Sequence, residues 1–384
     1  MKDSANPPSI VFGWRRLYTE ACLMHSSIDC IAASECNSQS FWKKSVGRLD
    51  HAIVIAGAPG DGRLDLILDT IQKIQQTHLP TQIRNEDGQS HLNDSLLRPR
   101  EVSLRVNSHH EIPLLSRPPS FSTFQSVSSL SPFVLRGHAS HWPAVADGRW
   151  SSKSYFKEIA GQGRIVPVEV GADYRTDSWT QKMMDWESFL DYLWPSETGG
   201  SSSGEVIYLA QHNLFKQFPE LSADIVKPDY VYCSLDPPEF FPHYKPPSND
   251  DQLVSNVWLG PAGTVSPAHT DPYFNVYVQV VGHKTVWLAP PTAQVAMSAF
   301  PDPSSSSSSN PAQNHENPSM SNTSRLDIFA ASDCDADGMI EFRRDVVPHA
   351  MSSVLGPGDM LFFPPGWWHA MRSEAVSFSV SMWF

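Results

Sequence analysis

The sequence predicts a mainly β protein with helices, in which a double-stranded β-helix, or jelly roll, follows an N-terminal helical region. In the stretch 256–291, apolar and aromatic residues alternate on both sides of a His-x-Asp pair, as they do in half-buried strands. The final run, AVSFSVSMWF, alternates large apolar residues with serines, which is typical of a strand with two different faces. Many such short strands between Gly and Pro turns favour two packed sheets that enclose a polar site.

The composition limits the classes of function that are compatible with this chain. Its 384 residues are enough for two or three domains, and its net charge of −13 argues against a nucleic-acid partner. A basic protein or peptide partner suits this charge better. The five cysteines form no CxxC pair, which indicates a reducing compartment without a disulfide framework or zinc cluster. We find no signal-peptide pattern and no apolar run of membrane-spanning length, and we expect a nuclear or cytoplasmic protein.

The first 85 residues are predicted to form a small helical domain. Apolar residues recur at helical spacing around Trp14 and Leu17, and again from Leu64 onwards. Between these segments, Gly57 and Gly62 have the spacing of a Walker A loop. The positions that should carry Lys and Ser or Thr are Arg63 and Leu64, so we interpret the loop as a turn between helices.

Residues 86–130 are rich in Ser, Pro and Asn, and we interpret them as a linker or a loosely held strap. From residue 131 the composition changes to that of a folded domain. We predict a strand in PFVLRG, a turn at HWPA, a Ser-capped helix in SSKSYFKEIAG and a strand in RIVPVEVGADY. A helix in WESFLDYLW follows, and VIYLAQHNLFKQFPEL reads as a strand that leads into a helix. PPEFFPHYKPPSNDD is predicted to be a loop.

Two later segments interrupt the strand pattern. Residues 301–325 form a Ser-, Pro- and Asn-rich insertion whose composition predicts a disordered surface loop. The acidic motif that follows resembles an EF-hand loop at Asp333, Asp335, Asp337 and Gly338. The last ligand position of such a loop needs a Glu, whereas this chain has Arg344, and we see no convincing flanking helix. We therefore interpret the motif as an acidic surface turn.

The strand-rich part also holds a candidate metal site. His269 and Asp271 are two positions apart on a predicted strand, so their side chains point to the same face. His369, in a second aromatic-rich turn, could complete the 2-His-1-carboxylate facial triad of non-haem Fe(II) oxygenases. An isolated His-x-Asp pair is a weak pattern, and most single histidines in strands bind no metal. Lys284 strengthens the hypothesis, because enzymes with this triad use a co-substrate whose remote carboxylate needs a cation.

Several motifs together resemble a known family. They are HWPA, RIVPVEVGADY, YLAQHNLF, PDYVYCSL, NVWLGPAGTVSPAHTDPYFN, VQVVGHK and SFSVSMWF. With them, residues from about 133 to 384 resemble the JmjC-domain Fe(II)/2-oxoglutarate oxygenases. The most similar subgroup is the small one that contains the arginyl hydroxylase also described as a histone lysine demethylase. The N-terminal helical part resembles this subgroup only in general character.

The resemblance implies a role for each of ten residues. The metal ligands would be His269, Asp271 and His369, the contacts to 2-oxoglutarate would be Tyr208, Ser266, Asn275 and Lys284, and the substrate pocket would contain Glu169, Tyr174 and Trp258. It implies a JmjC catalytic domain over 131–384, with Fe(II) as cofactor and 2-oxoglutarate and O₂ as co-substrates. It requires no general acid or base beyond the metal ligands. The Ser-rich insertion and the Pro-rich loop at 237–247 are longer than this subgroup leads us to expect.

Three classes of function remain open at this point. The first is a protein oxygenase that hydroxylates an arginyl side chain, or a related methyl-lysine demethylase that acts on a basic substrate such as a histone tail. The second is a non-redox, cupin-type metal-binding protein, and the third is a catalytically idle JmjC scaffold. Tyr208 and Lys284 favour the first class, because a simple metal-binding cupin has no use for a carboxylate clamp. Within it, Glu169 favours arginine, because a guanidinium pairs with a carboxylate whereas trimethyl-lysine is usually held by aromatic rings.

Overall fold

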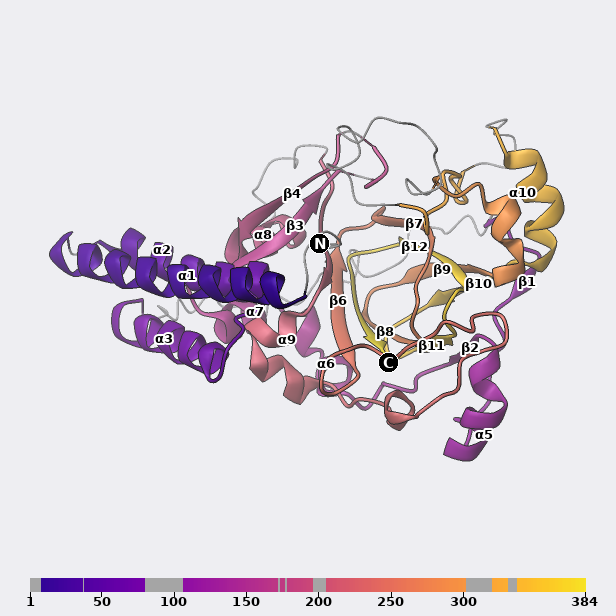
Figure 1. Ribbon diagram of the computed structural model, residues 1–384, viewed down its shortest axis with the longest axis horizontal. Helices are drawn as coiled ribbons and strands as arrows, with labels where there is room; N and C mark the ends of the chain where they lie inside the picture. Colours follow the sequence, from indigo (N-terminus) through magenta and orange to yellow (C-terminus); the bar gives the residue numbers. More distant parts are fainter. Residues whose placement is uncertain are drawn as a thin grey trace.

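Two β-sheets pack face to face, and a group of helices projects beyond one edge of the larger sheet (Figure 1). The structure is a computed structural model that describes residues 8–36, 38–79, 106–171, 173–176, 178–195, 205–301, 320–330 and 337–384. The smaller sheet has the order β1-β10-β9-β12-β7, and the larger has the order β2-β11-β8-β13-β6-β5-β3-β4. All strand neighbours are antiparallel except the parallel pair of β1 and β10. The predicted jelly roll is therefore confirmed.

The strands and helices have the following bounds. The smaller sheet consists of β1 (His110–Glu111), β10 (Met351–Leu355), β9 (Lys284–Ala289), β12 (Trp368–Ser373) and β7 (Val265–Thr270). The larger sheet consists of β2 (Phe133–Leu135), β11 (Met360–Phe363), β8 (Asn275–Val281), β13 (Ser377–Trp383), β6 (Val254–Gly260), β5 (Ile207–His212), β3 (Ile165–Val170) and β4 (Thr180–Asp185). The helices are α1 (Pro8–Cys36), α2 (Gln39–His51), α3 (Arg63–His78), α5 (Phe121–Ser126), α6 (Pro143–Ala146), α7 (Lys153–Ala160), α8 (Trp186–Leu193), α9 (Leu214–Gln217) and α10 (Met339–Asp345). The shorter helical turns are η1 (Ala52–Ala56), η2 (Ser128–Leu130), η3 (Arg149–Ser151), η4 (Pro219–Asp224), η5 (Asp229–Tyr232), η6 (Pro291–Met297) and η8 (Val347–His349).

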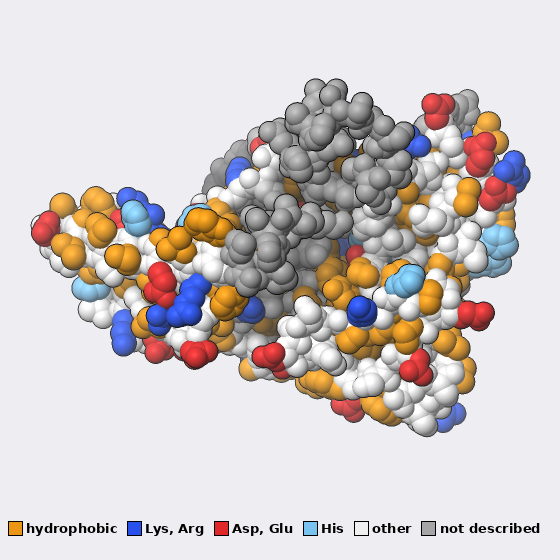
Figure 2. Space-filling view, in the orientation of Figure 1, with side chains coloured by type: hydrophobic (Ala, Val, Ile, Leu, Met, Phe, Trp, Pro, Cys, Tyr) orange, Lys and Arg blue, Asp and Glu red, His pale blue; other side chains and the backbone are white. Residues whose placement is uncertain are grey.

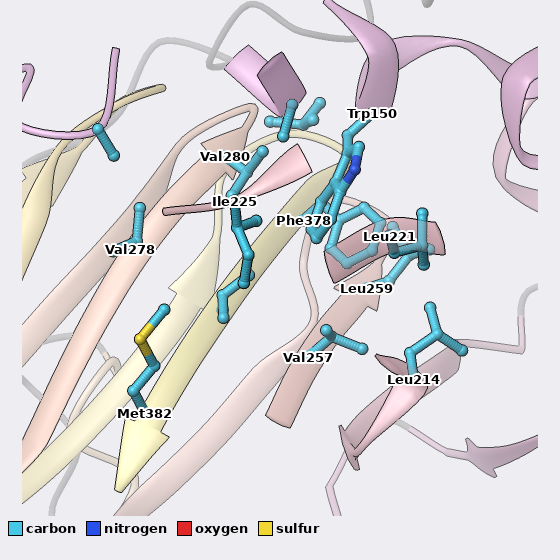
Figure 3. Packing of buried hydrophobic residues seen from close by; sticks show 14 of the residues in the cluster. Trp150, Leu214, Leu221, Ile225, Val257, Leu259, Val278, Val280, Phe378 and Met382 are labelled. Atoms are coloured by element: carbon cyan, nitrogen blue, oxygen red, sulfur yellow. The ribbon is translucent and has the colours of Figure 1, made fainter. Parts of the chain in front are cut away.

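The C-terminal strand β13 lies near the middle of the larger sheet and is buried on both faces. Its apolar face packs into the main core, where the Phe378 and Trp150 rings lie 4.4 Å apart between centroids (Figure 3). On its polar face, Ser379 donates to the Gln279 side chain at 2.8 Å, and Gln279 donates to Ser377 at 2.9 Å. Because these buried hydroxyls find partners, a serine face is compatible with burial between the sheets.

The N-terminal helices form their own apolar core and attach to the larger sheet. Trp42, Leu49 and Ile71 are buried in that core. The attachment is polar: the buried Asp50 carboxylate accepts two hydrogen bonds from Arg164 Nε and one from its Nη2, at 2.8–3.1 Å. Residues 57–62 connect η1 to α3 through left-handed glycines at both ends, so the predicted turn between helices is confirmed. No helix in the described ranges is long and apolar enough to cross a membrane.

The structure differs from the sequence-based expectations in three segments. Residues 106–130, the described part of the predicted strap at 86–130, have a defined structure. Ser120 caps α5, and the Phe124 side chain is completely buried. HWPA is the start of the short helix α6 rather than only a turn. A helix, α10, does follow Gly338, whereas Asp333 and Asp335 of the acidic motif lie outside the described residues.

The Ser-rich insertion at 301–325 also differs from the prediction at its C-terminal end. Residues 302–319 lie outside the described residues, but residues 320–325 lie beside strand β7. The backbone of Thr270 donates to Asn322, and that of Ser324 donates to Ala268, at 2.9 and 2.8 Å. The C-terminal end of the insertion is thus ordered although its composition predicts disorder, because the edge of β7 offers backbone hydrogen-bond partners.

Candidate metal centre and co-substrate pocket

Two histidines face each other on neighbouring strands of the smaller sheet. His269 near the end of β7 is the register partner of His369 on β12, and their ring centroids are 4.1 Å apart. Asp271 follows β7, and its Oδ2 lies 3.4 Å from His369 Nε2. One ligand atom from each of the three side chains falls within 4.8 Å of the other two. The structure thus brings together the three residues that the sequence predicts as metal ligands, and that role remains a prediction.

Backbone carbonyls fix the tautomer of each imidazole. His269 Nδ1 lies 2.8 Å from the Pro267 carbonyl, and His369 Nδ1 lies 3.1 Å from the Trp367 carbonyl. Because a carbonyl oxygen can only accept, both Nδ1 atoms carry a proton, and in the neutral form of each ring the lone pair is therefore on Nε2. In that form His369 Nε2 and Asp271 Oδ2 are two acceptors 3.4 Å apart, an arrangement that suits a cation bound by both.

The electrostatics of the three groups also suit metal ligation. Burial and, to a smaller extent, the neighbouring His369 lower the pKa of His269 to about 4 against the opposing charge of Asp271, so the ring is neutral at physiological pH. Burial opposes ionisation of Asp271, but the interactions with the adjacent His369 and His269 outweigh it and keep the pKa of that carboxyl below its ordinary value. Two imidazoles and one carboxylate are the donor set of non-haem Fe(II) sites.

A pocket opens next to these ligands, between the two sheets. Its lining consists of Tyr208, Trp258, Ser266, His269, Asp271, Asn275, Tyr277, His369, Met371 and Ser381. Four of the residues predicted from sequence therefore border the same space as the candidate ligands. The Asn275 amide oxygen is buried and has no hydrogen-bond partner among the described residues. Such an atom is compatible with a ligand or water in this pocket.

Lys284 lies behind this lining. Its side chain is only 2 % exposed, and its Nζ donates to the Tyr277 hydroxyl at 2.9 Å. The ammonium also lies 5.8 and 5.7 Å from the ring centroids of Tyr208 and Tyr277. Burial lowers the pKa of this ammonium to about 7. In the described part of the chain, Lys284 thus reaches the pocket through Tyr277, a residue that the sequence prediction did not include.

Tyr277 and Ser381 could have been found from strand periodicity. Tyr277 stands two positions after Asn275 on β8, so both side chains point to the same face. Ser381 belongs to the serine face of β13, is the register partner of Tyr277, and accepts a hydrogen bond from Trp258 Nε1 at 3.0 Å. Tyr208 is buried, which raises the pKa of its hydroxyl well above its ordinary value, and Ser266 hydrogen-bonds to it.

The predicted substrate residue Glu169 lies one strand further from the pocket. It is the register partner of Tyr208, on the face of β3 opposite to the buried Val168 and Val170. Trp179 Nε1 donates to Glu169 Oε2 at 3.3 Å. Burial raises the pKa of this carboxyl, against the opposing effect of the hydrogen bonds from Trp179 and Gln181.

Tyr174, in the loop after β3, lies near the candidate ligand Asp271. Burial raises the pKa of its hydroxyl to about 12, against a hydrogen bond with Thr323, and the charge of Asp271 reaches it. Thr323 itself forms a β-bridge with His269. Tyr174 and the ordered end of the insertion therefore lie together on one side of the candidate ligands, whereas Glu169 lies beside Tyr208.

Comparison with known proteins places this geometry in a family. Residues 118–384 match the family described as cupin-like domain (Cupin_8). Jumonji C domain-containing protein 5 of Drosophila melanogaster is 35% identical over 311 residues, which cover 78% of this chain and 66% of the relative. Lysine-specific demethylase 8 of Danio rerio is 31% identical over 375 residues, covering 97% and 81%. Lysine-specific demethylase JMJ30 of Arabidopsis thaliana is 34% identical over 255 residues, covering 66% and 50%.

The matched region thus spans between half and about four fifths of these relatives' lengths. The family match covers the part of the chain that contains both sheets, the three candidate ligands and the pocket. The sequence resemblance to JmjC proteins is confirmed. The chain therefore belongs to the JmjC group of the cupin-like family, the group of Fe(II)- and 2-oxoglutarate-dependent dioxygenases.

Proposed function

We propose that this protein is an Fe(II)- and 2-oxoglutarate-dependent oxygenase that hydroxylates an arginyl side chain of a protein substrate. Family membership supports the general reaction, and the surroundings of Glu169 support the choice of arginine. A carboxylate that is shielded from solvent is costly when its partners are neutral, and the half-buried Glu169 receives hydrogen bonds from an indole and an amide. A guanidinium would compensate its charge through paired hydrogen bonds and would pack on the nearby aromatic rings.

In this proposal His269, Asp271 and His369 hold the metal. With 2-oxoglutarate and O₂, bound Fe(II) supplies the oxidising chemistry, and the protein supplies placement and exclusion of water. The Nδ1–H bonds to the Pro267 and Trp367 carbonyls would leave the Nε2 atoms to bind the metal.

The other pocket residues would position the two organic molecules. Tyr208, Ser266, Asn275 and Lys284 would bind 2-oxoglutarate, with the Lys284 ammonium providing the positive charge near its remote carboxylate. Tyr277 would belong to this set, because its hydroxyl joins Lys284 to the pocket lining. Glu169, Tyr174 and Trp258 would surround the substrate side chain.

A second candidate function is removal of methyl groups from lysine. The names of the Danio rerio and Arabidopsis thaliana relatives, both lysine-specific demethylases, favour it. Methyl-lysine would need aromatic faces more than a carboxylate, and Trp258, Tyr208 and Tyr174 provide such faces near the centre. In either case the substrate is a basic peptide, in keeping with the net charge of −13, and the site of action is the nucleus or the cytoplasm.

Mass spectrometry of peptide arrays tests the proposal directly. Peptides that differ only in a central Arg, Lys or methylated Lys are incubated with the protein, Fe(II) and 2-oxoglutarate. We expect Arg peptides to gain one oxygen, and we expect Glu169→Gln to lose this product while it still binds metal and 2-oxoglutarate. Glu158→Gln, at an exposed position on α7, is the matched control.

Each alternative predicts a different product in the same experiment. Loss of methyl groups without an oxidised arginine would establish the demethylase instead. Normal arginine oxidation by Glu169→Gln would remove that residue from the substrate site. Metal binding without any turnover of 2-oxoglutarate would point to the non-redox cupin or the idle scaffold.

A further inference from the structure

The long helix α1 turns its large apolar side chains towards solvent. Trp14, Leu17, Met24, Ile28 and Ile31 are 64%, 57%, 69%, 60% and 61% exposed. Figure 2 shows hydrophobic side chains grouped on the part of the molecule where α1 and α2 project. Scattered exposed apolar residues are normal, but a contiguous row along one helix marks a surface that binds something.

The opposite face of α1 is small and polar, and this is the face that packs on α2. Ser26 and Ser45 share a buried hydrogen bond of 2.6 Å, and Asp29 accepts from Arg48 at 2.7 Å. The helix is therefore inverted relative to an ordinary surface helix, whose apolar stripe faces the core. Packing on α2 leaves the apolar stripe available.

The apolar residues have the spacing of a coiled-coil seam. Counting from Trp14, the row continues through Leu17, Ala21, Met24, Ile28 and Ile31, with alternating steps of three and four residues. This is the a/d pattern of a heptad repeat, which packs best against another helix with the same pattern. We call these six residues the outer seam of α1.

We propose that two copies of this chain associate through the outer seams of their α1 helices, packed antiparallel about a two-fold axis. An antiparallel pair centred between Ala21 and Met24 places the small Ala21 opposite the large Met24. It also places Trp14 opposite Ile31, and Leu17 opposite Ile28. A parallel pair would instead set Ala21 against Ala21 and Trp14 against Trp14, which matches volumes poorly.

The size of the outer seam also fits a second copy. Five large side chains, each more than half exposed, offer on the order of 500 Å² of apolar surface per copy. Two such seams bury on the order of 1,000 Å², close to the lower limit for a specific interface between proteins. A membrane surface is a poorer occupant, because α1 carries two Arg against three Asp or Glu and the chain has a net charge of −13.

Light scattering coupled to size exclusion, over a range of protein concentrations, tests the dimer. We expect the full chain to dimerise, and we expect Leu17→Glu with Ile28→Glu to raise the dissociation constant at least about a hundredfold. Val295→Glu, at a side chain that is 94% exposed outside α1, is the control and should leave the dimer intact. The far-UV circular dichroism spectrum and 2-oxoglutarate turnover should be unchanged in the double variant, because the seam lies on the surface and outside the candidate site.

Cysteine crosslinking tests the antiparallel orientation. In a Cys36→Ser background, a mixture of Ala21→Cys and Met24→Cys proteins should form a mixed disulfide dimer, whereas Trp14→Cys alone should not crosslink. In the proposed pair the two copies of residue 14 are about 25 Å apart along the helices, given the rise per residue. A monomer at every concentration would overturn the proposal, and a Trp14→Cys dimer would overturn its orientation. Neither result depends on which substrate the enzyme oxidises.

Discussion

At the scale of single residues, each candidate metal-ligating histidine is oriented by the carbonyl two residues before it. The Pro267 carbonyl orients His269, and the Trp367 carbonyl orients His369. The two histidines are therefore held by the same type of local hydrogen bond. One carbonyl belongs to strand β7 and the other immediately precedes strand β12, so neither needs a metal to be in place. The centre is therefore expected to be assembled on a finished β-scaffold rather than to drive folding.

Loss of one ligand should then abolish activity and leave the fold intact. We expect His269→Ala and Asp271→Ala to reduce 2-oxoglutarate turnover by at least about a hundredfold, because each removes one of three metal contacts. Succinate release measures turnover, and a thermal shift with added Mn²⁺ measures metal binding. The variants should melt near the metal-free parent and should lose the metal-dependent shift. Full turnover in either variant would contradict the facial-triad assignment.

Lys284 should affect 2-oxoglutarate far more than metal. Replacing it with Ala removes a charge-assisted contact to a buried carboxylate, which we expect to cost about 1.5–3 kcal/mol, or roughly ten- to a hundredfold in affinity. Titration of 2-oxoglutarate into the Mn²⁺-loaded protein measures this loss. Lys182→Ala, at an exposed lysine on β4, is the control. An unchanged affinity in Lys284→Ala would show that the ammonium does not serve the co-substrate.

The same residue predicts a pH dependence. Burial lowers the pKa of Lys284 to about 7, and a bound carboxylate interacts with the protonated form. Affinity for 2-oxoglutarate should therefore be complete below about pH 7 and should fall as the pH rises through that value. Lys284→Arg stays protonated throughout, so any residual binding by that variant should depend much less on pH. Equal parent affinities at about pH 6 and about pH 9 would contradict this prediction.

The sequence could predict residues that share a strand, but not those that meet across sheets. His269 and Asp271 follow from the period of a strand, and Lys284 from its position at the start of the next run. Tyr277 stands between Lys284 and the pocket only because β8 and β9 lie in opposite sheets. That contact depends on how the two sheets pack, which no local pattern contains.

At the scale of elements, the ordered end of the insertion acts as an extra strand beside β7. Thr323 forms a bridge with His269, and Arg175 holds the same segment from the other side by donating to the carbonyls of Ser324 and Leu326, at 3.0 and 2.7 Å. Asp173 fixes the guanidinium in turn. The segment is therefore tied both to a candidate metal ligand's strand and to the loop that carries Tyr174.

Removing this tie should loosen the segment without unfolding the sheets. Arg175→Ala deletes two charge-assisted hydrogen bonds to backbone, each worth about 1.5–3 kcal/mol in such contacts. We expect the Thr270 and Ser324 amides, which bond across this edge, to exchange hydrogen at least about tenfold faster. Arg117→Ala, at an exposed arginine, should leave both amides as they are. Equal exchange in Arg175→Ala would mean that the β7 pairing alone holds the segment.

Composition misled the prediction at this point for a physical reason. A Ser- and Asn-rich run cannot build a core of its own, but a few of its residues can complete an existing one. Thr323 and Ser324 are buried, and Thr323 pairs with His269 of the smaller sheet. The segment that contains α5 is ordered for the same reason. Its Phe124 packs into the main core, which exists only in the folded domain.

At the scale of the whole molecule, the helical region and the larger sheet share a buried polar junction. Asp50 on α2 accepts from Arg164, from the Ile165 amide at 2.9 Å and from Gln217 at 2.8 Å. Arg164 also stacks over the Phe218 ring, at 4.5 Å from its centroid. The sequence separated residues 1–85 from the catalytic part by composition, and it could not show this contact, because its members are 114 and 167 residues apart.

The junction leads to a prediction about cooperativity. Asp50 is 0% exposed and Arg164 is 5% exposed, so removal of one partner leaves the other charge buried without compensation. We expect Asp50→Ala to lower the free energy of unfolding by about 3–5 kcal/mol, measured by urea denaturation. Asp69→Ala, at an exposed carboxylate on α3, should change it little. Arg164→Met in the Asp50→Ala background should recover part of the loss, because no charge is then left unpaired.

The lower stability of Asp50→Ala should be measurable both in the N-terminal helices and in the larger sheet. The Ile165 amide begins β3, and β3 carries Glu169 beside Tyr208, so the carboxylate of an N-terminal helix helps to hold the strand that borders the candidate substrate site. Hydrogen exchange in Asp50→Ala should accelerate in β3 as well as in α2. If only the helices exchanged faster, while β3 and 2-oxoglutarate turnover stayed unchanged, the helical region would be a separate folding unit. The buried position of Asp50 argues for one cooperative structure. If α2 unfolded alone, Asp50 would leave Arg164, and the guanidinium would lose its buried partner.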